Sequence, residues 1–188
     1  MKIYVVDNGG QWTHREYRVL RDLGVETKIV PNTSLSTELD DLDGLVLSGG
    51  APSIASEIDK LGNIGSFIND HSYPILGICA GLHFIALHFG GEVGPGHHPE
   101  FGKTEVTISS GDRILAGLPE KIIAWENHND EVKKLPEDFK VLASSKTCKI
   151  QAFAHKTRPI FAVQFHPEVE NTQFGRKIFE NFVEICRP

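Results

Sequence analysis

The chain has 188 residues, of which 40% are hydrophobic, and this size and composition predict one compact domain with a full core. Its formal net charge of −6 comes from 25 acidic and 19 basic residues, and no basic patch suggests binding to nucleic acid. No apolar run approaches the ~18–20 residues of a membrane-spanning helix, and the sequence opens on a strand pattern rather than a signal peptide. The three cysteines, Cys79, Cys148 and Cys186, are odd in number and far apart, which is typical of a reducing compartment. We therefore expect a soluble cytoplasmic protein.

The first half of the chain alternates apolar runs with helical patterns. Residues 3–6 form a β-branched run typical of a strand buried on both faces, and a helix ending at Gly24 follows the turn at 7–11. The glycines of 7–11 do not match a phosphate-binding fingerprint, so we interpret them as a tight strand-to-helix turn. Further strands are predicted at 27–30, 44–47 and 75–78, and a helix at 58–69. These strand–loop–helix units predict a single-domain α/β fold with a mostly parallel, doubly wound open sheet flanked by helices.

The second half has a different pattern. We expect a surface loop at 94–100, which is rich in glycine and proline, and a half-exposed strand at 104–108. Short strands are predicted at 121–125, 140–143, 150–154 and 160–163, and they indicate a smaller antiparallel or mixed portion of the sheet. A last amphipathic helix follows, for which Asn171 or Thr172 is the expected N-cap.

Cys79 stands between an apolar strand and a helix that glycine ends at Gly90. A nucleophile on such a sharp strand-to-helix turn is held above the sheet with its side chain exposed. Helix N-terminal amides beside a cysteine favour the thiolate. The alternative interpretation is a small buried apolar side chain, as most free cysteines are. A partner base elsewhere in the chain decides between the two.

Histidine precedes proline and glutamate twice, in His98-Pro-Glu100 and in His166-Pro-Glu168. A thiolate mechanism needs an imidazole within hydrogen-bond reach and a third group that orients it. The second copy follows the apolar run 160–165, which can hold His166 rigidly beneath Cys79, with Glu168 as the orienting carboxylate. The first copy lies in the expected surface loop. We therefore predict that His166, and not His98, is the catalytic imidazole.

Three ordered motifs carry a resemblance to a known family: Ser48-Gly-Gly50, Gly77-Ile-Cys-Ala-Gly81 and Gln164-Phe-His-Pro-Glu168. Together they resemble the class I (triad) glutamine amidotransferases over nearly the whole chain. The resemblance implies that residues 1–188 form one type-1 amidotransferase domain with a flavodoxin-like fold. It also implies that Cys79 attacks the side-chain amide of glutamine, that His166 protonates the departing ammonia and activates water, and that Glu168 orients His166.

Within that class, the segments 7–11, 30–33, 128–132 and 166–169 resemble most closely the separate glutaminase subunits of archaeal-type GMP synthases. Such a subunit takes part in purine nucleotide biosynthesis as half of a heterodimer. Its expected partner is an ATP-pyrophosphatase subunit that aminates XMP to GMP, and ATP and Mg²⁺ are expected on that partner. No cofactor or metal is expected in this chain. Because the sequence ends at Pro188, we expect the ligase half to be another polypeptide.

The resemblance also implies a substrate site. The backbone amides of Gly50 and Ala80 are the expected oxyanion hole. The segment 127–129 is expected to be a polar loop that holds the α-amino and α-carboxylate groups of glutamine, and Asp130 is expected to couple this loop to the partner. The implied substrate-binding residues are Gly49, His83, Asn127, His128 and Asn129. His83 departs from the family, which usually has a glutamine at this position.

Two alternatives stay open at this point. Glutaminase subunits of chorismate-using synthases usually read His-Pro-Glu-Ser, whereas this chain has Val169 after Glu168. The second alternative is a non-catalytic regulatory subunit on the same fold, because a fold does not determine a function. His83 favours this second alternative, and the intact set of Cys79, His166 and Glu168 opposes it.

Overall fold

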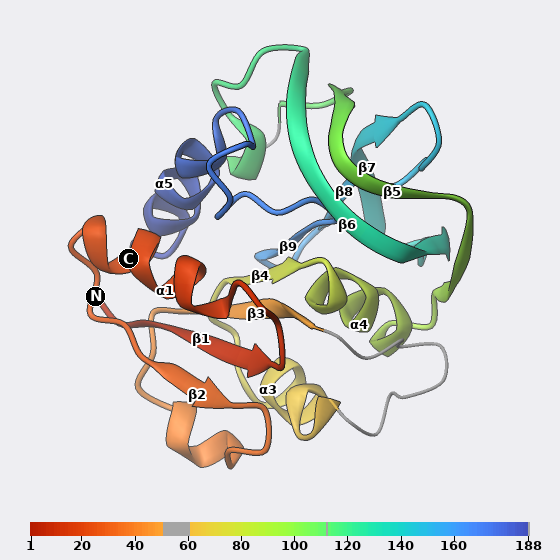
Figure 1. Cartoon of the computed structure of the whole chain (residues 1–188). Helices are drawn as coiled ribbons and strands as arrows, with labels where there is room; N and C mark the ends of the chain where they lie inside the picture. The colour runs from red at the N-terminus through yellow and green to blue at the C-terminus, as the bar shows by residue number, and fades with distance from the viewer. Residues whose placement is uncertain (51–60, 112, 188) are drawn as a thin grey trace.

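The computed structural model describes residues 1–50, 61–111 and 113–187, and their strands form a single mixed sheet (Figure 1). The parallel portion contains β1 (Ile3–Asn8), β2 (Ile29–Pro31), β3 (Gly44–Gly50), β4 (Ile75–Ile78) and β9 (Ile160–Val163). The antiparallel portion contains β5 (Glu92–Ile108), β6 (Lys121–Lys134), β7 (Phe139–Ser145) and β8 (Ala152–His155). The strand order is β2-β1-β3-β4-β9-β8-β7-β5-β6. The predicted α/β fold, with a parallel sheet and a mixed C-terminal portion, is therefore confirmed.

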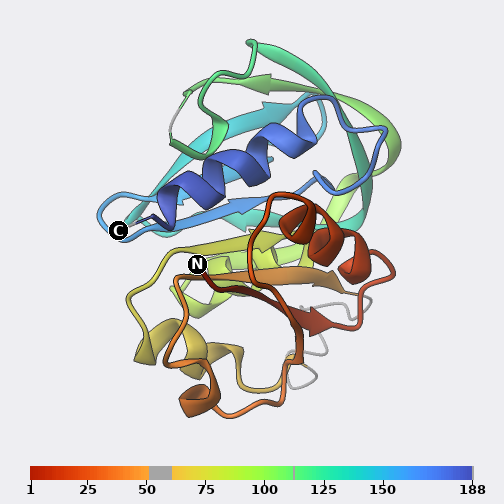
Figure 2. The ribbon, with the colours of Figure 1, turned by 90° about the vertical axis from the view of Figure 1, so that its left-hand side faces the viewer.

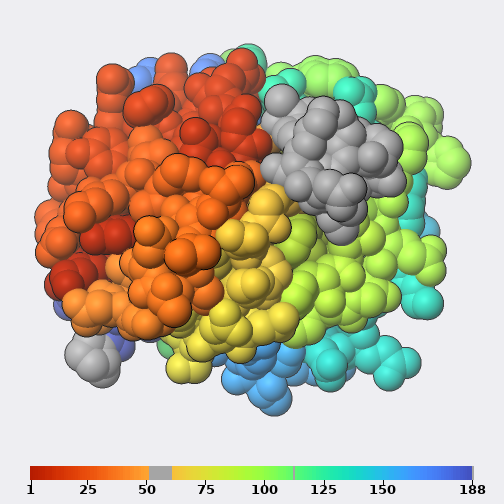
Figure 3. Space-filling view, turned by 90° about the horizontal axis from the view of Figure 1, so that it is seen from below, coloured from red at the N-terminus to blue at the C-terminus, as the bar shows by residue number. Residues whose placement is uncertain are grey.

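Helices cover both faces of the sheet. On one face α1 (Thr13–Asp22) and α5 (Gly175–Ile185) bury Leu20, Phe179 and Phe182 against the strands (Figure 2). On the other face α3 (Ile64–Asp70) and α4 (Ala80–His88) bury Phe67 and Ile85. Two short 3₁₀ helices, η1 (Ser36–Leu39) and η3 (Arg113–Leu115), lie in connections. Seen from below, segments of the first half of the chain make up most of the surface (Figure 3).

Within the described ranges, every helix is too short or too polar to cross a membrane.

The ends of the helices follow the sequence signals in part. Gly24, at a φ of +78°, ends α1, and Gly90, at a φ of +87°, ends α4, as predicted. The predicted cap of the last helix is wrong, because α5 begins at Gly175 after Phe174. A Cβ at residue 175 would lie 2.0 Å from the carbonyl oxygen of Pro167, so this close approach requires glycine. Thr172 has another role, which is described with the site.

The helix predicted at 58–69 is α3, and it begins only at Ile64. Residues 58–60 of that prediction lie outside the described residues. The strand predicted at 27–30 is shifted, since β2 includes Pro31. At its end β2 pairs with β1 through Pro31 and Asp7.

Two predicted loops are wrong. Residues 94–100 belong to β5 and residues 127–129 belong to β6, and the two strands pair as a long antiparallel ribbon (Figure 1). The register of the pairing shifts twice. It shifts between Glu92 and Val93, and again after Pro95, which faces Asp130, because the next pair is Glu100 with His128. The inward positions here carry buried polar side chains instead of apolar ones, which hides the strand periodicity that apolar residues would give.

Candidate active site

Cys79 occupies the sharp turn between β4 and α4. Its φ of +49° and ψ of −102° are rare for any residue with a side chain. The turn is fixed by hydrogen bonds from the Cys79 amide to the Val163 carbonyl (2.9 Å) and from the His83 amide to the Cys79 carbonyl (3.1 Å). Gly81 lets α4 pack tightly on β3, since a Cβ there would lie 2.3 Å from the Leu47 carbonyl oxygen. The predicted strand–turn–helix around Cys79 is therefore confirmed.

His166 lies on the loop after β9, where a carboxylate and the backbone hold it. Its Nδ1 is 2.7 Å from Oε1 of Glu168. The His166 amide donates to the Trp125 carbonyl (3.0 Å), and the Trp125 amide donates to Oγ1 of Thr172 (2.9 Å). That hydroxyl donates in turn to the His166 carbonyl (2.7 Å). Thr172, expected as a helix cap, thus fastens the histidine loop to β6.

Gly49, at the end of β3, shows how close the turn and the loop come. A Cβ at residue 49 would lie 3.1 Å from Cε1 of His166 and 3.7 Å from Cβ of Cys79. Burial opposes a positive charge on His166, but the negative charges of Glu168 and Cys79 outweigh it and raise the pKa of His166 well above its usual value. The surroundings of the imidazole therefore favour its protonated form, which can give up a proton.

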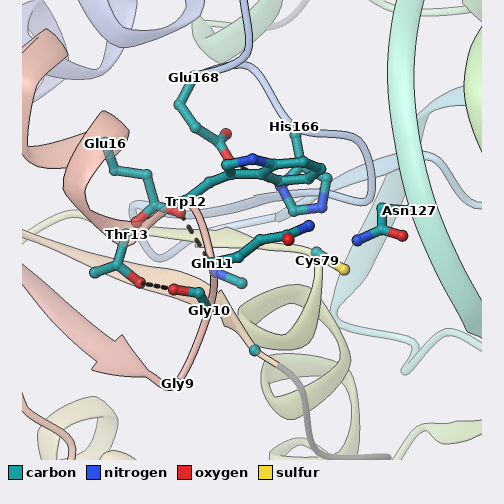
Figure 4. Close-up of a pocket in the computed structure, with 12 residues that line it drawn as sticks. Gly9, Gly10, Gln11, Trp12, Thr13, Glu16, Cys79, Asn127, His166 and Glu168 are labelled. Carbon is teal, nitrogen blue, oxygen red and sulfur yellow. Dashed lines mark hydrogen bonds and ion pairs between the residues drawn. The ribbon is translucent and has the colours of Figure 1, made fainter.

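These residues open onto one cavity of about 330 Å³ (Figure 4). Six residues predicted from the sequence line it together: Gly49, Gly50, Cys79, Asn127, His166 and Glu168. Gly50 also lies beside Ala80, the first residue of α4, because a Cβ at residue 50 would be 3.3 Å from the Ala80 Cβ. The backbone segments predicted to form an oxyanion hole are therefore adjacent.

The remaining wall comes from residues 9–13 and Glu16, which sequence reasoning missed as part of the site. In Figure 4, Trp12 and Gln11 reach over the cavity toward His166 and Cys79. The rings of Trp12 and His166 meet edge to face with centroids 4.4 Å apart. The sequence contained one signal that this turn belongs to the site. The turn at 7–11 follows the carboxyl end of a parallel strand, which is where open α/β sheets bind ligands.

Glu16 brings a second carboxyl group to the cavity wall. Its side chain is buried, and Oε1 accepts a hydrogen bond from the Gly49 amide at 3.4 Å. Burial, and after it the charge of Glu168, raises the pKa of Glu16 well above its usual value. Oε2 of Glu16, Nε2 of His166 and Oε2 of Glu168 are buried polar atoms with no hydrogen-bond partner among the described residues. Three such atoms around one cavity fit a polar ligand.

Other predicted site residues lie away from the cavity. His83 does not line it, and its Nε2 is 2.7 Å from Oε1 of Gln164. Asn129 is exposed on β6, and His98 is exposed on β5. Asp130, also on β6, accepts a hydrogen bond at its carbonyl from Nδ1 of His128 (2.9 Å). His83, Asn129 and Asp130 are therefore not among the residues that line the cavity, and neither is His98, which was predicted not to be catalytic.

His128 belongs to a buried polar network between β5, β6 and the strands beside them. Its Nε2 lies 3.0 Å from Oε2 of Glu100 and 3.4 Å from Oε2 of Glu126. Gln151 and Ser145 also donate to Glu100, at 2.6 and 2.5 Å. Because these contacts turn the His128 ring toward the interior of the sheet, its predicted contact with the substrate has no support in the geometry.

The same network contains the described residues that come closest to a metal-ligand set. Ligand atoms of Glu100, His128 and Cys148 all lie within 4.8 Å of one another. However, Glu100 already accepts hydrogen bonds at both oxygens, and burial raises the pKa of the Cys148 thiol to about 12. A cysteine binds a metal as the thiolate, which a raised pKa disfavours. These residues therefore fit a hydrogen-bonded network that supports the strands better than a cation site.

The fold, the nucleophile turn and the histidine loop agree with the family that the sequence resembles. The family model for the class-I glutamine amidotransferases matches residues 4–186. The chain belongs to this family.

Individual relatives are similar to the chain over nearly their whole length. The chain is 68% identical over 187 residues to a subunit of the glutamine-hydrolysing GMP synthase of Thermoplasma volcanium, covering 100% of this chain and 93% of that protein. It is 48% identical to the protein of the same name from Archaeoglobus fulgidus, over the full length of both. A Thermoplasma acidophilum protein whose crystal structure is described as that of a GMP synthase subunit is 67% identical, with a TM-score of 0.96 over 99% of this chain and 94% of that chain.

Proposed function

We propose that this chain is the glutaminase subunit of a two-subunit GMP synthase. In this proposal, residues 1–188 act as one type-1 amidotransferase domain in the cytoplasm. The observation that carries the proposal is the meeting of Cys79, on its strained turn, with the paired His166 and Glu168 at one cavity. The names of the full-length archaeal relatives support GMP synthase over a chorismate-using synthase.

The first half of the reaction makes a thioester. The Cys79 sulfur attacks the side-chain amide carbon of glutamine, and the carbonyl electron pair moves onto the oxygen. The backbone amides of Gly50 and Ala80 hold this oxyanion, and each such donor typically contributes about 10²–10³ in rate. The His166 imidazolium then protonates the amide nitrogen, the carbon–nitrogen bond breaks, and ammonia leaves.

The second half releases glutamate. Neutral His166 removes a proton from water, the resulting hydroxide attacks the thioester carbon, and the carbon–sulfur bond breaks. The Cys79 thiolate and the His166 imidazolium are restored, so one water is consumed for each glutamine. Glu168, bonded to Nδ1 of His166, fixes which ring nitrogen faces the reaction and stabilises the imidazolium in both halves.

The ammonia passes to a partner, which we propose is an ATP-pyrophosphatase subunit that aminates XMP. ATP and Mg²⁺ act on that partner, and no step in this chain requires them. At the cavity of this chain, Asn127 is the remaining predicted polar contact for the α-amino and α-carboxylate groups of glutamine. Glu16, whose pKa burial raises, and the Trp12 ring close the other side of the same cavity.

The division of labour is tested by Cys79→Ala in the assembled complex. This variant should abolish glutamine-dependent GMP synthesis and leave ammonia-dependent synthesis unchanged, because the partner consumes free ammonia directly. Both activities are measured by XMP consumption with saturating glutamine or an ammonium salt. Equal loss of the glutamine-dependent and the ammonia-dependent activity would show that the proposed function is wrong.

The choice of base is tested with the two His-Pro-Glu copies. His166→Ala should reduce glutaminase activity by about 10²–10⁴, the usual contribution of general acid–base catalysis. His98→Ala is the matched control, and since His98 is exposed on β5 it should retain most of the activity. The reverse ranking of the two variants in a glutamate-release assay would show that the assignment of the base is wrong.

A further inference from the structure

Two buried side chains that do not line the cavity lie against the nucleophile. Gln164 directly follows β9 and is fully buried, and its Nε2 lies 3.7 Å from Sγ of Cys79. His83 is one turn along α4 from Cys79, and it is also buried. Nε2 of His83 and Oε1 of Gln164 are 2.7 Å apart. The three side chains therefore form a continuous row from α4 through Gln164 to the sulfur.

The backbone fixes the spacing within this row. The Cys79 amide donates to the Val163 carbonyl at 2.9 Å, and the Gln164 amide donates to the Gln151 carbonyl at 2.8 Å. These bonds tie β4 to β9 and β9 to β8 on either side of the row. The sulfur and the Gln164 side chain are therefore held at a separation that the sheet determines.

Charge sets the direction of the hydrogen bonds. Burial lowers the pKa of His83 to about 4, although the bond with Gln164 opposes this shift, so the ring is neutral at pH 7. A neutral imidazole has one N–H, and in this arrangement Nε2 donates it to the Gln164 oxygen. An amide whose oxygen accepts from His83 presents its N–H groups to the sulfur on the other side.

We propose that Gln164 and His83 are positioning residues for the nucleophile: the Gln164 amide donates a hydrogen bond to the Cys79 sulfur, and His83 holds that amide in the donating orientation. This inference rests on the proposed role of Cys79. The N–H stabilises negative charge on sulfur from the core side, while His166 approaches from the cavity side. His83 thus acts on the nucleophile and not on the substrate.

The substitutions that test the proposal leave the charged neighbours of Cys79 in place. These neighbours are His166 and Glu168 on the loop after β9 and Glu16 on α1. Beyond His83, the ring of His128 and both the carboxylate and the backbone of Asp130 on β6 also act on the row. Gln164→Met removes the N–H and keeps much of the volume. His83→Leu removes the donor that orients the amide, and His83→Gln restores a donor.

The experiment follows alkylation of Cys79 by iodoacetamide from pH 5 to pH 10 in the purified full-length chain, using mass spectrometry of the Cys79 peptide. Cys148 and Cys186 serve as internal controls, because burial raises the pKa of each thiol to about 12. In Gln164→Met the rate profile should move up by about one pH unit, with about tenfold slower alkylation on its acid side. His83→Leu should move it in the same direction, and His83→Gln should restore the wild-type profile. Thr37→Met, at an exposed position in η1 far from the site, is the neutral control and should leave it unchanged.

The outcomes separate the inference from the proposed function. If folded Gln164→Met, checked by its melting temperature, keeps the wild-type profile, the inference is wrong and the role of Cys79 stands. If wild-type Cys79 reacts no faster than Cys148, the nucleophile itself is wrong and the inference falls with it. Should Gln164→Met fail to fold, Gln164→Glu replaces it. A carboxylate facing the sulfur should shift the profile upward at least as far, and an unchanged profile would again overturn the inference.

Discussion

A strained backbone holds the proposed nucleophile. Cys79 has a φ of +49°, a region where a Cβ clashes with the backbone and where a residue other than glycine costs about 1–3 kcal/mol. The hydrogen bonds of its amide and carbonyl hold it there. The side chain is buried rather than exposed, but the turn places it on the cavity wall next to Gly49 and His166. Conformational strain at this residue is therefore linked to the placement of the sulfur.

The backbone strain at residue 79 can be measured as a difference in the free energy of unfolding between two variants. Cys79→Gly should have a free energy of unfolding about 1 kcal/mol higher than Cys79→Ala, because both variants lack the thiol and only alanine keeps a Cβ at positive φ. Urea denaturation of the two variants gives the difference. Ala86→Gly, inside α4, is the control with the opposite sign and should lose about 1 kcal/mol. If the alanine variant proves the more stable at residue 79, the turn is not strained.

At the scale of single residues, the sequence pointed to Cys79 and His166, which line one cavity, but it did not reveal the residues that hold them in place. Cys79 and His166 stand in short motifs whose residue types are tied to a chemical role. Gln164 opens a motif that carries the resemblance, and Thr172 was expected as a helix cap, but neither residue type reveals the contact that it makes. Their roles depend on residues distant in the sequence. Trp12 belongs to no motif that the sequence analysis identified, although its ring contacts the imidazole.

Among the elements, the β5–β6 ribbon differs most from expectation. Strand periodicity is read from apolar residues, but here the inward positions include Glu100, Glu126 and His128. Their mutual hydrogen bonds and ion pairs make burial tolerable, and no property of a single residue reveals these partners. The parallel strands β1, β3, β4 and β9 are apolar and were predicted close to their observed positions. The ribbon was predicted only in fragments.

The ribbon should make stability depend on pH. Burial raises the pKa of Glu126 to about 7 from its usual 4.5, although the charge of His128 opposes the shift. Because the folded-state pKa is the higher one, the stabilisation is complete below about pH 4.5 and is lost as the pH rises through 7. Glu126→Gln removes this loss. The variant should therefore be more stable than wild type at pH 8 by roughly 1–3 kcal/mol, and the gain should shrink toward pH 5.

Urea denaturation at pH 5, 6.5 and 8 measures this difference. Glu105→Gln is the matched control on β5, because Glu105 forms an exposed ion pair with Lys121 and should change stability by less than ~1 kcal/mol at any pH. A gain for Glu126→Gln that is the same at pH 5 and pH 8 would mean that Glu126 does not titrate in this range.

On the scale of the whole molecule, the single chain brings the proposed catalytic groups together at one place. Cys79, His166 and Glu168 come from two separate segments, and the parallel sheet places both at one cavity. The contact of Glu16 with Gly49 and the contact of Trp12 with His166 tie the N-terminal wall to the same place. On the proposed substrate side, Asn127 of the ribbon lines the cavity and pairs with the exposed Phe101 of β5. A partner that docks on the β5–β6 ribbon would therefore act first on the position of Asn127.

We therefore expect the isolated subunit to be a poor glutaminase that docking of its partner activates through glutamine binding. Because residues 127–129 lie in β6 and not in the expected polar loop, the movement that we propose is a shift of the β5–β6 ribbon. A displacement of about 1 Å at Asn127 can cost ~10² in rate, so a small movement suffices.

Partner, ATP and XMP together should raise kcat/KM for glutamine at least tenfold and change the rate of Cys79 alkylation less than twofold. Asp130→Ala should reduce this activation, whereas Asp138→Ala, an exposed acid in the β6–β7 connection, should not. A pure subunit that hydrolyses glutamine as fast as the complex would show that no such switch exists, and activation unchanged by Asp130→Ala would place the switch elsewhere on the chain.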